Sequence, residues 1–187
     1  MDILVIVDMQ NDFITGCLGT KEAQEILPKV IEFVKNFKGP IFPTMDEHWE
    51  GDDTQELQKF GNHCIVATVG RKYPQELEVL LEKKHAKCYC KNRFMPEKYK
   101  RKDLWKEVDY AVTENQFDIQ DIYVCGLCTN ICVLNTALYL RCYLPYENII
   151  ILKDLCAGTT PENHQKALDI MKINLIDNIE SKEVVNG

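Results

Sequence analysis

Three cysteines lie close together in the second half of the chain. The stretch GLCTNICVLNTA (Gly126–Ala137) contains Cys128 and Cys132, and Cys125 comes directly before it. An apolar run typical of a strand passes here into a helical pattern, so we expect Cys132 in the first helical turn. The amides of a helix N-terminus lower the pKa of a thiol and favour the nucleophilic thiolate. From the residues alone, Cys132 is either such a nucleophile or a thiol packed in the core.

Cys125 and Cys128 offer a competing interpretation, because together they form a C-x-x-C pair. A redox pair of the thioredoxin type would also lie where a strand meets a helix. A zinc site would need a second pair of ligands, and the sequence has no matching C-x-x-C or histidine pair. Alternation along the strand would bury Cys125, which favours packing over redox chemistry.

An acid and a base follow two other predicted strands. Asp8 comes directly after Ile3–Val7, and Lys91 comes directly after Ala86–Cys90. In a parallel sheet the carboxyl ends of the strands meet at one edge, where ligands bind. We therefore expect Asp8, Lys91 and Cys132 to converge on one cleft.

A candidate metal site follows the strand Pro40–Thr44. Two imidazoles and two carboxylates suit a divalent transition metal such as zinc, iron or manganese. Asp52 and Asp53 compete for the place of the second acidic ligand, and the histidines could also be ordinary loop or core residues. The predicted ligands are Asp46, His48, Glu56 and His63.

Apolar strands alternate with helical patterns along the whole chain. This order predicts a three-layer, doubly wound α/β fold with a mainly parallel six-stranded sheet and helices on both faces. The expected strands are Ile3–Val7, Pro40–Thr44, Ala86–Cys90, Ile122–Cys125, Asn148–Leu152 and a weak one near Val184. The expected helices are Lys21–Phe37, Pro74–Lys84, Asp103–Asn115, Asn130–Cys142 and Pro161–Ile173. Pro28 should start a new segment or kink the first helix.

Composition narrows the class of protein. The chain has 187 residues, 45% hydrophobic and 27% charged, and a net charge of −7. That charge argues against nucleic acid and anionic membranes as partners. Nine cysteines without a secretory signal favour free thiols in a cytoplasmic, reducing setting. Most of them should be small core residues, among them Cys88, Cys90, Cys142 and Cys156.

Three motifs together resemble the isochorismatase-like cysteine hydrolase superfamily, and within it small bacterial enzymes of the nicotinamidase and pyrazinamidase type. They are VDMQNDF (Val7–Phe13), GLCTNICVLNTA (Gly126–Ala137) and KDLCAGTTPENH (Lys153–His164). The likeness runs from Ile3 to about Ile173. It implies a single hydrolase domain over residues 1–187 and, as relatives often form dimers or tetramers, a homo-oligomer.

The resemblance also implies roles for individual residues. A catalytic triad falls on Asp8, Lys91 and Cys132. The backbone amides of Cys128 and Cys132 would form an oxyanion hole, with a cis peptide before Cys128. The family's metal site falls on Asp46, His48, Glu56 and His63, with zinc as the first expectation. The aromatic walls of the substrate pocket fall on Phe13, Phe60 and Phe94.

The activity implied is release of ammonia from a small carboxamide through a thioester, with nicotinamide as the leading substrate. The alternatives are another small amide, such as an N-carbamoyl compound or a ureide, and a non-catalytic or redox C-x-x-C module. The sequence departs from the family at Asn130, where relatives carry aspartate, and at Met95-Pro96, where small and aromatic residues are common.

Overall fold

The computed structural model describes residues 1–95, 120–144 and 148–184. Six strands and the helices between them follow one another along these residues. The strands are β1 (Ile3–Val7), β2 (Ile41–Asp46), β3 (Tyr89–Lys91), β4 (Asp121–Leu127), β5 (Asn148–Ala157) and β6 (Asp177–Ile179). The α-helices are α1 (Asn11–Ile14), α2 (Lys21–Asn36), α3 (Gln55–Phe60), α4 (Gln75–Lys83), α6 (Leu134–Tyr143) and α7 (Pro161–Ile173).

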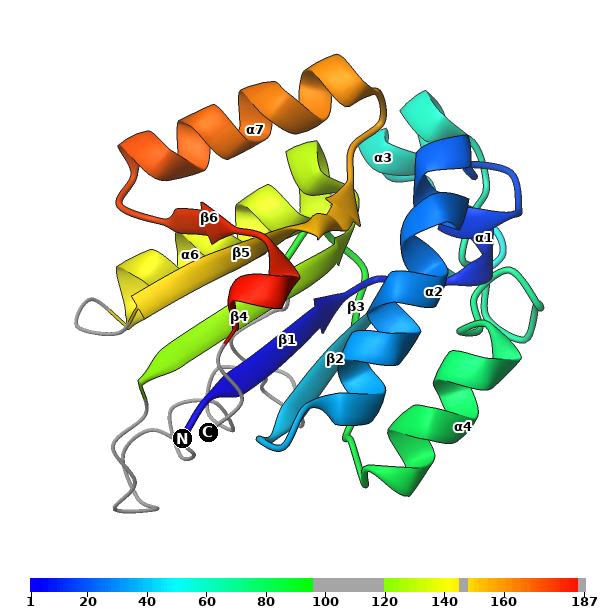
Figure 1. Cartoon of the computed structure of the whole chain (residues 1–187). Helices are drawn as coiled ribbons and strands as arrows, with labels where there is room; N and C mark the ends of the chain where they lie inside the picture. Colours follow the sequence, from blue (N-terminus) through cyan, green and yellow to red (C-terminus); the bar gives the residue numbers. More distant parts are fainter. Residues whose placement is uncertain (96–119, 145–147, 185–187) are drawn as a thin grey trace.

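The strands form one sheet in the order β3-β2-β1-β4-β5-β6, and every neighbouring pair is parallel. The chain starts in the centre with β1, moves outward to β3, and returns to the other side of β1 with β4. Because right-handed crossovers in opposite directions place helices on opposite faces, α2 and α4 cover one face and α6 and α7 cover the other (Figure 1). The doubly wound fold predicted from the sequence is confirmed.

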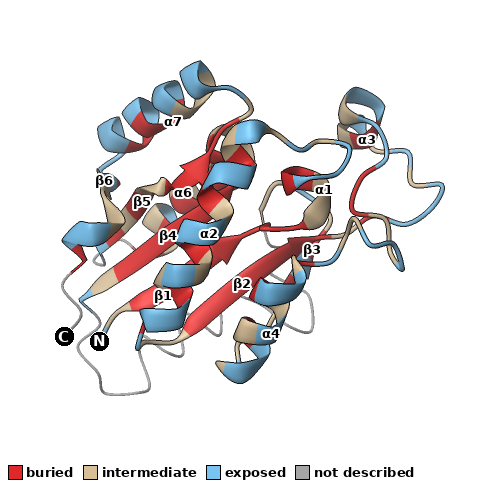
Figure 2. Ribbon diagram, turned by 45° about the vertical axis from the view of Figure 1, so that its right-hand side comes forward, coloured by how far each residue is buried: buried red, intermediate tan, exposed pale blue. Residues whose placement is uncertain are grey.

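The core lies on both faces of the central strands (Figure 2). All five residues of β1 are fully buried, as expected of an apolar strand covered by helices on both sides. Buried apolar residues of the outer helices, such as Val30 in α2 and Met171 in α7, belong to the same core as the strands. The ends of the central strands therefore emerge from a packed core.

Helix α2 is continuous through Pro28, which excludes one of the two alternatives expected there, the start of a new segment. Its N-terminus is capped by Thr20, whose hydroxyl accepts a hydrogen bond from the Ala23 amide. Pro28 lies inside the helix, so it starts no new segment. None of the helices in the described part of the chain combines the length and apolar character of a membrane span.

The remaining differences between the predicted and the observed elements are near the C-terminal end of the described residues. The last strand is Asp177–Ile179, and Val184 instead follows a 3₁₀ turn at Ser181–Glu183, so the strand expected near Val184 was wrong. Helix α7 begins as predicted, with Pro161 in its first turn and Thr160 as its cap. The predicted helix Asp103–Asn115 lies outside the described residues.

Candidate active site

Four strands deliver polar side chains to the carboxyl edge of the sheet. Asp8 follows β1 directly, Asp46 is the last residue of β2, and Lys91 is the last residue of β3. Asp46 and Lys91 stand opposite each other in the β2–β3 ladder. Cys132 comes from the turn after β4, which pairs with β1 on its other side. The site thus spans the point where the chain changes direction across the sheet.

The ammonium group of Lys91 joins the acid and the thiol. Its Nζ lies 2.7 Å from Oδ2 of Asp8, 3.3 Å from Oδ1 of Asp46 and 3.5 Å from Sγ of Cys132. The side chains of Lys91, Asp8 and Asp46 are all fully buried. A buried charge is stable only when it is paired, so this lysine and its carboxylates hold one another in place.

The protonation states follow from burial and from these neighbours. Burial opposes the charge of Lys91, but Asp8, Cys132 and Asp46 raise its pKa well above the usual value. Burial raises the pKa of Cys132, Lys91 opposes this, and the charge of Asp8 adds to it. We expected the amides of the helix N-terminus to lower the pKa of Cys132, and Lys91 does act in that direction. The net shift is upward, because burial and two carboxylates outweigh a single cation.

The backbone after β4 differs from the helix predicted to start at Asn130. A cis peptide joins Leu127 to Cys128, and residues Thr129–Val133 form a π-helical turn before α6 begins. Gly126 has a φ of 122°, and a Cβ there would collide with the backbone oxygen of Val7. Glycine therefore lets β4 approach β1 closely at the point where both strands reach the site.

The four predicted metal ligands form one group. Their ligand atoms, from Asp46, His48, Glu56 and His63, all lie within 4.8 Å of one another. Oδ2 of Asp46 is 3.0 Å from Nε2 of His48 and 3.3 Å from Nε2 of His63. The two imidazoles are buried. The donor set of two imidazoles and two carboxylates fits a divalent transition metal.

Hydrogen bonds to other atoms of the ligand residues fix the geometry of the candidate metal ligands. The Nδ1 of His63 bonds to the Gly61 carbonyl at 2.8 Å, which directs its Nε2 to Asp46. The backbone of His48 forms a β-bridge with Ile65. The side chain of Gln10 bonds both backbone groups of Asp46, at 2.8 Å to its carbonyl and 2.7 Å from its amide.

The choice among the acidic residues near α3 is now clear. Asp52 accepts a bond from the Trp49 amide, and Asp53 accepts one from the Gln58 side chain. Both aspartates thus accept hydrogen bonds from residues close in sequence, whereas Oε1 of Glu56 lies 3.7 Å from Nε2 of His63. Glu56 is therefore the residue that completes the group.

A cavity of about 280 Å³ opens onto the thiol. It is mainly apolar in its lining, and it reaches from the candidate metal ligands to the π-helical turn. The three predicted aromatic residues all line it, so the structure brings them together with Cys132. Its walls include Phe13, Phe60, Phe94, Cys128, Cys132, Glu56 and His63.

Three polar contacts at the site were not foreseen. The hydroxyl of Thr44 donates a 2.7 Å bond to Oδ1 of Asp8, so both carboxylate oxygens of Asp8 have partners. Asn130 accepts from the Thr159 amide at 2.8 Å and donates to the Thr159 hydroxyl at 3.1 Å. Asn130 thus ties the turn that carries Cys132 to the loop after β5, which an aspartate, lacking a donor, could do only in part.

The cysteines divide into buried and exposed sets. Cys125 and Cys156 are core residues as predicted, with Cys125 fully buried in β4. Cys88 is half-buried and packs against the core, whereas Cys90 and Cys142 are exposed, so the core assignment of these two was wrong. Met95 is half-buried, and Pro96 lies outside the described residues.

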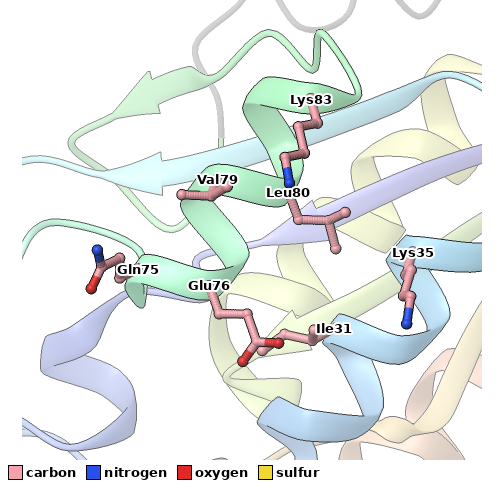
Figure 3. Close-up of a pocket in the computed structure, with 7 residues that line it drawn as sticks. All are labelled: Ile31, Lys35, Gln75, Glu76, Val79, Leu80 and Lys83. Carbon is pink, nitrogen blue, oxygen red and sulfur yellow. The ribbon is translucent and has the colours of Figure 1, made fainter.

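A second hollow lies between α2 and α4, away from the thiol (Figure 3). It shares no lining residue with the cavity at Cys132. The long side chains along it belong to the outer surfaces of the two helices, so it takes no part in the site. Its lining residues are Ile31, Lys35, Gln75, Glu76, Val79, Leu80 and Lys83.

Comparison with known proteins agrees with this arrangement. The chain matches the isochorismatase domain over residues 2–182. It is 28% identical to an uncharacterised isochorismatase family protein, PncA, of Bacillus subtilis, over 88% of this chain and 91% of that one. A crystal structure of nicotinamidase/pyrazinamidase PncA from Bacillus subtilis superposes with a TM-score of 0.78 at 28% identity, covering 96% of this chain and 99% of that one.

A second solved structure is similar over nearly its whole length. The pyrazinamidase of Pyrococcus horikoshii, in complex with zinc, gives a TM-score of 0.76 at 26% identity, with 96% of this chain and 98% of that one covered. The matched residues include all the side chains of the candidate site from Asp8 to Cys132. This chain belongs to the isochorismatase family.

Proposed function

We propose that this isochorismatase-family hydrolase, which acts on C–N bonds, releases ammonia from a small planar carboxamide, with nicotinamide as the leading substrate. One observation carries the proposal: Lys91 lies between Asp8, at 2.7 Å, and Cys132, at 3.5 Å, at the end of an apolar cavity. An acid, a thiol and a fixed cation are the parts of a nucleophilic amidase. Relatives with the same fold are nicotinamidases and pyrazinamidases.

In the proposed reaction, Asp8 takes the proton of Cys132 as the sulfur attacks the amide carbon. A resting thiol requires such a base, and burial raises the pKa of Asp8 itself, which makes it a better proton acceptor. The backbone amides of Cys128 and Cys132 would stabilise the oxyanion. Asp8 then gives the proton to the departing ammonia, and water hydrolyses the thioester to release the acid. Lys91 holds Asp8 in place throughout.

Asp46, His48, Glu56 and His63 would hold one divalent ion, and zinc is the first candidate because a pyrazinamidase relative contains it. When bound, the ion supplies a Lewis-acid anchor for the ring nitrogen of the substrate, directly or through water. The protein's part is orientation. Glu56 and His63 line the cavity beside the aromatic side chains, so a ring held there points its amide toward Cys132.

The test is ammonia release from nicotinamide, pyrazinamide, an N-carbamoyl amine and a ureide, measured before and after chelation. We expect the two ring amides to give the highest kcat/KM. Activity on the N-carbamoyl compound or the ureide alone would replace nicotinamide as the substrate but keep the thiol chemistry. No ammonia from any amide would overturn the proposal. A redox C-x-x-C role has little support, since Cys125 is fully buried.

Removing one imidazole should weaken metal binding. In His48→Ala we expect substoichiometric metal by elemental analysis and a KM for nicotinamide at least about tenfold higher, because losing even a hydrogen-bond partner of a metal ligand typically weakens metal binding about tenfold or more. His85→Asn is the control, since His85 is exposed and lies outside the group. Unchanged metal content and KM in His48→Ala would contradict this assignment.

Phe94→Ala should weaken substrate binding more than folding. Phe94 is half-buried and lines the cavity, so its ring contributes more to a bound substrate than to the core. We expect a five- to tenfold rise in KM, about 1 kcal/mol of binding, with a small change in melting temperature. Phe37→Ala is the matched control, because Phe37 is a core ring at 3% exposure and should lower stability with KM unchanged. The reverse pattern would make Phe94 a core residue.

The proposal also covers the setting of the enzyme. We propose a single hydrolase domain that works in the cytoplasm as a homo-oligomer on a small-molecule substrate. Light scattering on the purified chain tests the oligomer directly. A monomer would remove that part of the proposal and leave the chemistry unaffected.

A further inference from the structure

A second pair of thiols lies at the edge strand, outside the catalytic cavity. In β3 the side chains alternate, so Tyr89 and Lys91 point into the protein while Cys90 is exposed. Cys88 precedes the strand and has the parity of Cys90, which places both thiols on the same side. Neither residue lines the cavity at Cys132. The proposed reaction therefore makes no use of these two thiols.

A guanidinium group is fixed against the exposed sulfur. Nη2 of Arg71 lies 3.3 Å from Sγ of Cys90, and the same nitrogen pairs with the carboxylate of Glu47. The Arg71 carbonyl accepts a 2.7 Å bond from the Gln10 side chain. Arg71 is thus held at both its backbone and its side chain. An immobile cation beside an accessible sulfur is the setting that makes a cysteine reactive.

A buried tyrosine lies against the inner thiol. The hydroxyl of Tyr73 lies 3.3 Å from Sγ of Cys88 and donates a 2.7 Å bond to the Thr44 carbonyl. A hydrogen bond from Cys88, together with Arg71, lowers the pKa of Cys90 to about 7, against burial and the charge of Glu47. The same contact with Cys90, with burial, raises the pKa of Cys88. Cys88 therefore remains a thiol and donates to the Cys90 thiolate.

We propose that Cys90 is a site of oxidative modification in this protein, at which the thiolate reduces a hydroperoxide. The sulfur attacks the outer oxygen of the peroxide, an S–O bond forms and the O–O bond breaks. Cys90 becomes a sulfenic acid, and the peroxide leaves as an alcohol, or as water from hydrogen peroxide, after taking up a proton. Arg71 binds the thiolate, and Cys88 donates a hydrogen bond to it.

Cys17 provides a reference inside the same molecule. It is also exposed, but its S–H donates to the Asn62 carbonyl at 3.5 Å. Burial and the charge of Asp12 raise its pKa. At pH 7 a thiol with a pKa near 7 is about half ionised, against roughly 3% for an ordinary free thiol, and less for Cys17, whose pKa is raised. A thiolate of lower pKa is also less nucleophilic, which offsets part of the advantage from ionisation. We therefore expect Cys90 to react about fivefold faster than Cys17.

The experiment is hydrogen peroxide treatment at pH 7 with a sulfenic-acid trap present, followed by mass spectrometry that assigns adducts to individual cysteines. We expect the adduct at Cys90 to form at least about fivefold faster than at Cys17. In Arg71→Met the rate at Cys90 should fall about fivefold, whereas Arg71→Lys, which keeps the charge, should retain most of it. Cys88→Ser keeps a donor and removes the second thiol, so trapping at Cys90 should persist.

The rate at Cys17 and the melting temperature report on folding in each variant. Equal rates at Cys90 and Cys17 in the wild type would overturn the proposal, and this comparison needs no variant. A rate at Cys90 that is unchanged in a folded Arg71→Met protein would also overturn it. Because the readout is an adduct and not ammonia, the result is independent of the proposed amidase activity.

Discussion

Cys132→Ala is expected to abolish ammonia release, with kcat lower by about 10⁴-fold or more. The reason is that Cys132 is the proposed nucleophile, whose sulfur would form the thioester. Cys132 is the thiol that Lys91 contacts at 3.5 Å, in the cavity where the substrate would lie. The loss of one buried sulfur should leave the fold intact, which circular dichroism and thermal melting would confirm. Substrate binding should persist and can be measured by calorimetry.

Cys128→Ala is the matched control for this prediction. Cys128 lines the same cavity, but its expected contribution is a backbone amide that alanine also provides. We expect activity within a few-fold of wild type. If a folded Cys128→Ala were as inactive as Cys132→Ala, the assignment of the nucleophile would fail.

Lys91→Met is expected to cause the largest loss of stability at the site, together with loss of turnover. The variant leaves the buried carboxylates of Asp8 and Asp46 without their shared cation. Breaking a buried ion pair by removing one partner costs about 3–5 kcal/mol of unfolding free energy, a large part of the usual total. Urea unfolding at two pH values measures it.

The pH dependence of this loss has a definite sign. Burial already raises the pKa of Asp8, and Lys91 opposes that rise. Without Lys91, Asp8 keeps its proton to a higher pH in the folded state than in the unfolded state. The free energy of unfolding therefore falls as the pH rises through the pKa of Asp8 in the folded state. The deficit relative to wild type should be smaller at pH 5 than at pH 8.

Asp8→Asn combined with Lys91→Met is the control for this variant. Removing both charges should recover part of the stability and none of the activity. A single Lys91→Met protein as stable as wild type at pH 8 would mean that the lysine does not neutralise the carboxylates.

Long apolar strands were predictable from the sequence, and short or polar elements were not. The run of five apolar residues in β1 admits one interpretation, and the acid after it falls where parallel strands end. Strand β6 is three residues long and begins Asp-Asn, so its sequence shows no strand pattern. The last strand was predicted near Val184 instead, because valine is β-branched and favours strands. Helices α1 and α3 are too short for a helical period to show.

The protonation and exposure of the cysteines also lay beyond the sequence. The π-helical turn at Thr129–Val133 has no distinct pattern, and the pKa of Cys132 depends on how deeply that turn is buried. The general preference of cysteine for the core was a poor guide to Cys90, whose exposure follows from its place on an edge strand. These properties depend on tertiary contacts that no local window contains.

The pairing of β1 with β4 has a consequence for how the enzyme becomes active. Val7 pairs with Gly126, which lies more than half the chain length further on. Contacts of such sequence separation form slowly, because the entropy of closing the long loop must be overcome first. Asp8 follows β1 and Cys132 follows β4, so the two residues come together only when these strands pair. A nascent chain therefore carries no hydrolytic activity until β4 has emerged and docked, and turnover reports completion of the fold.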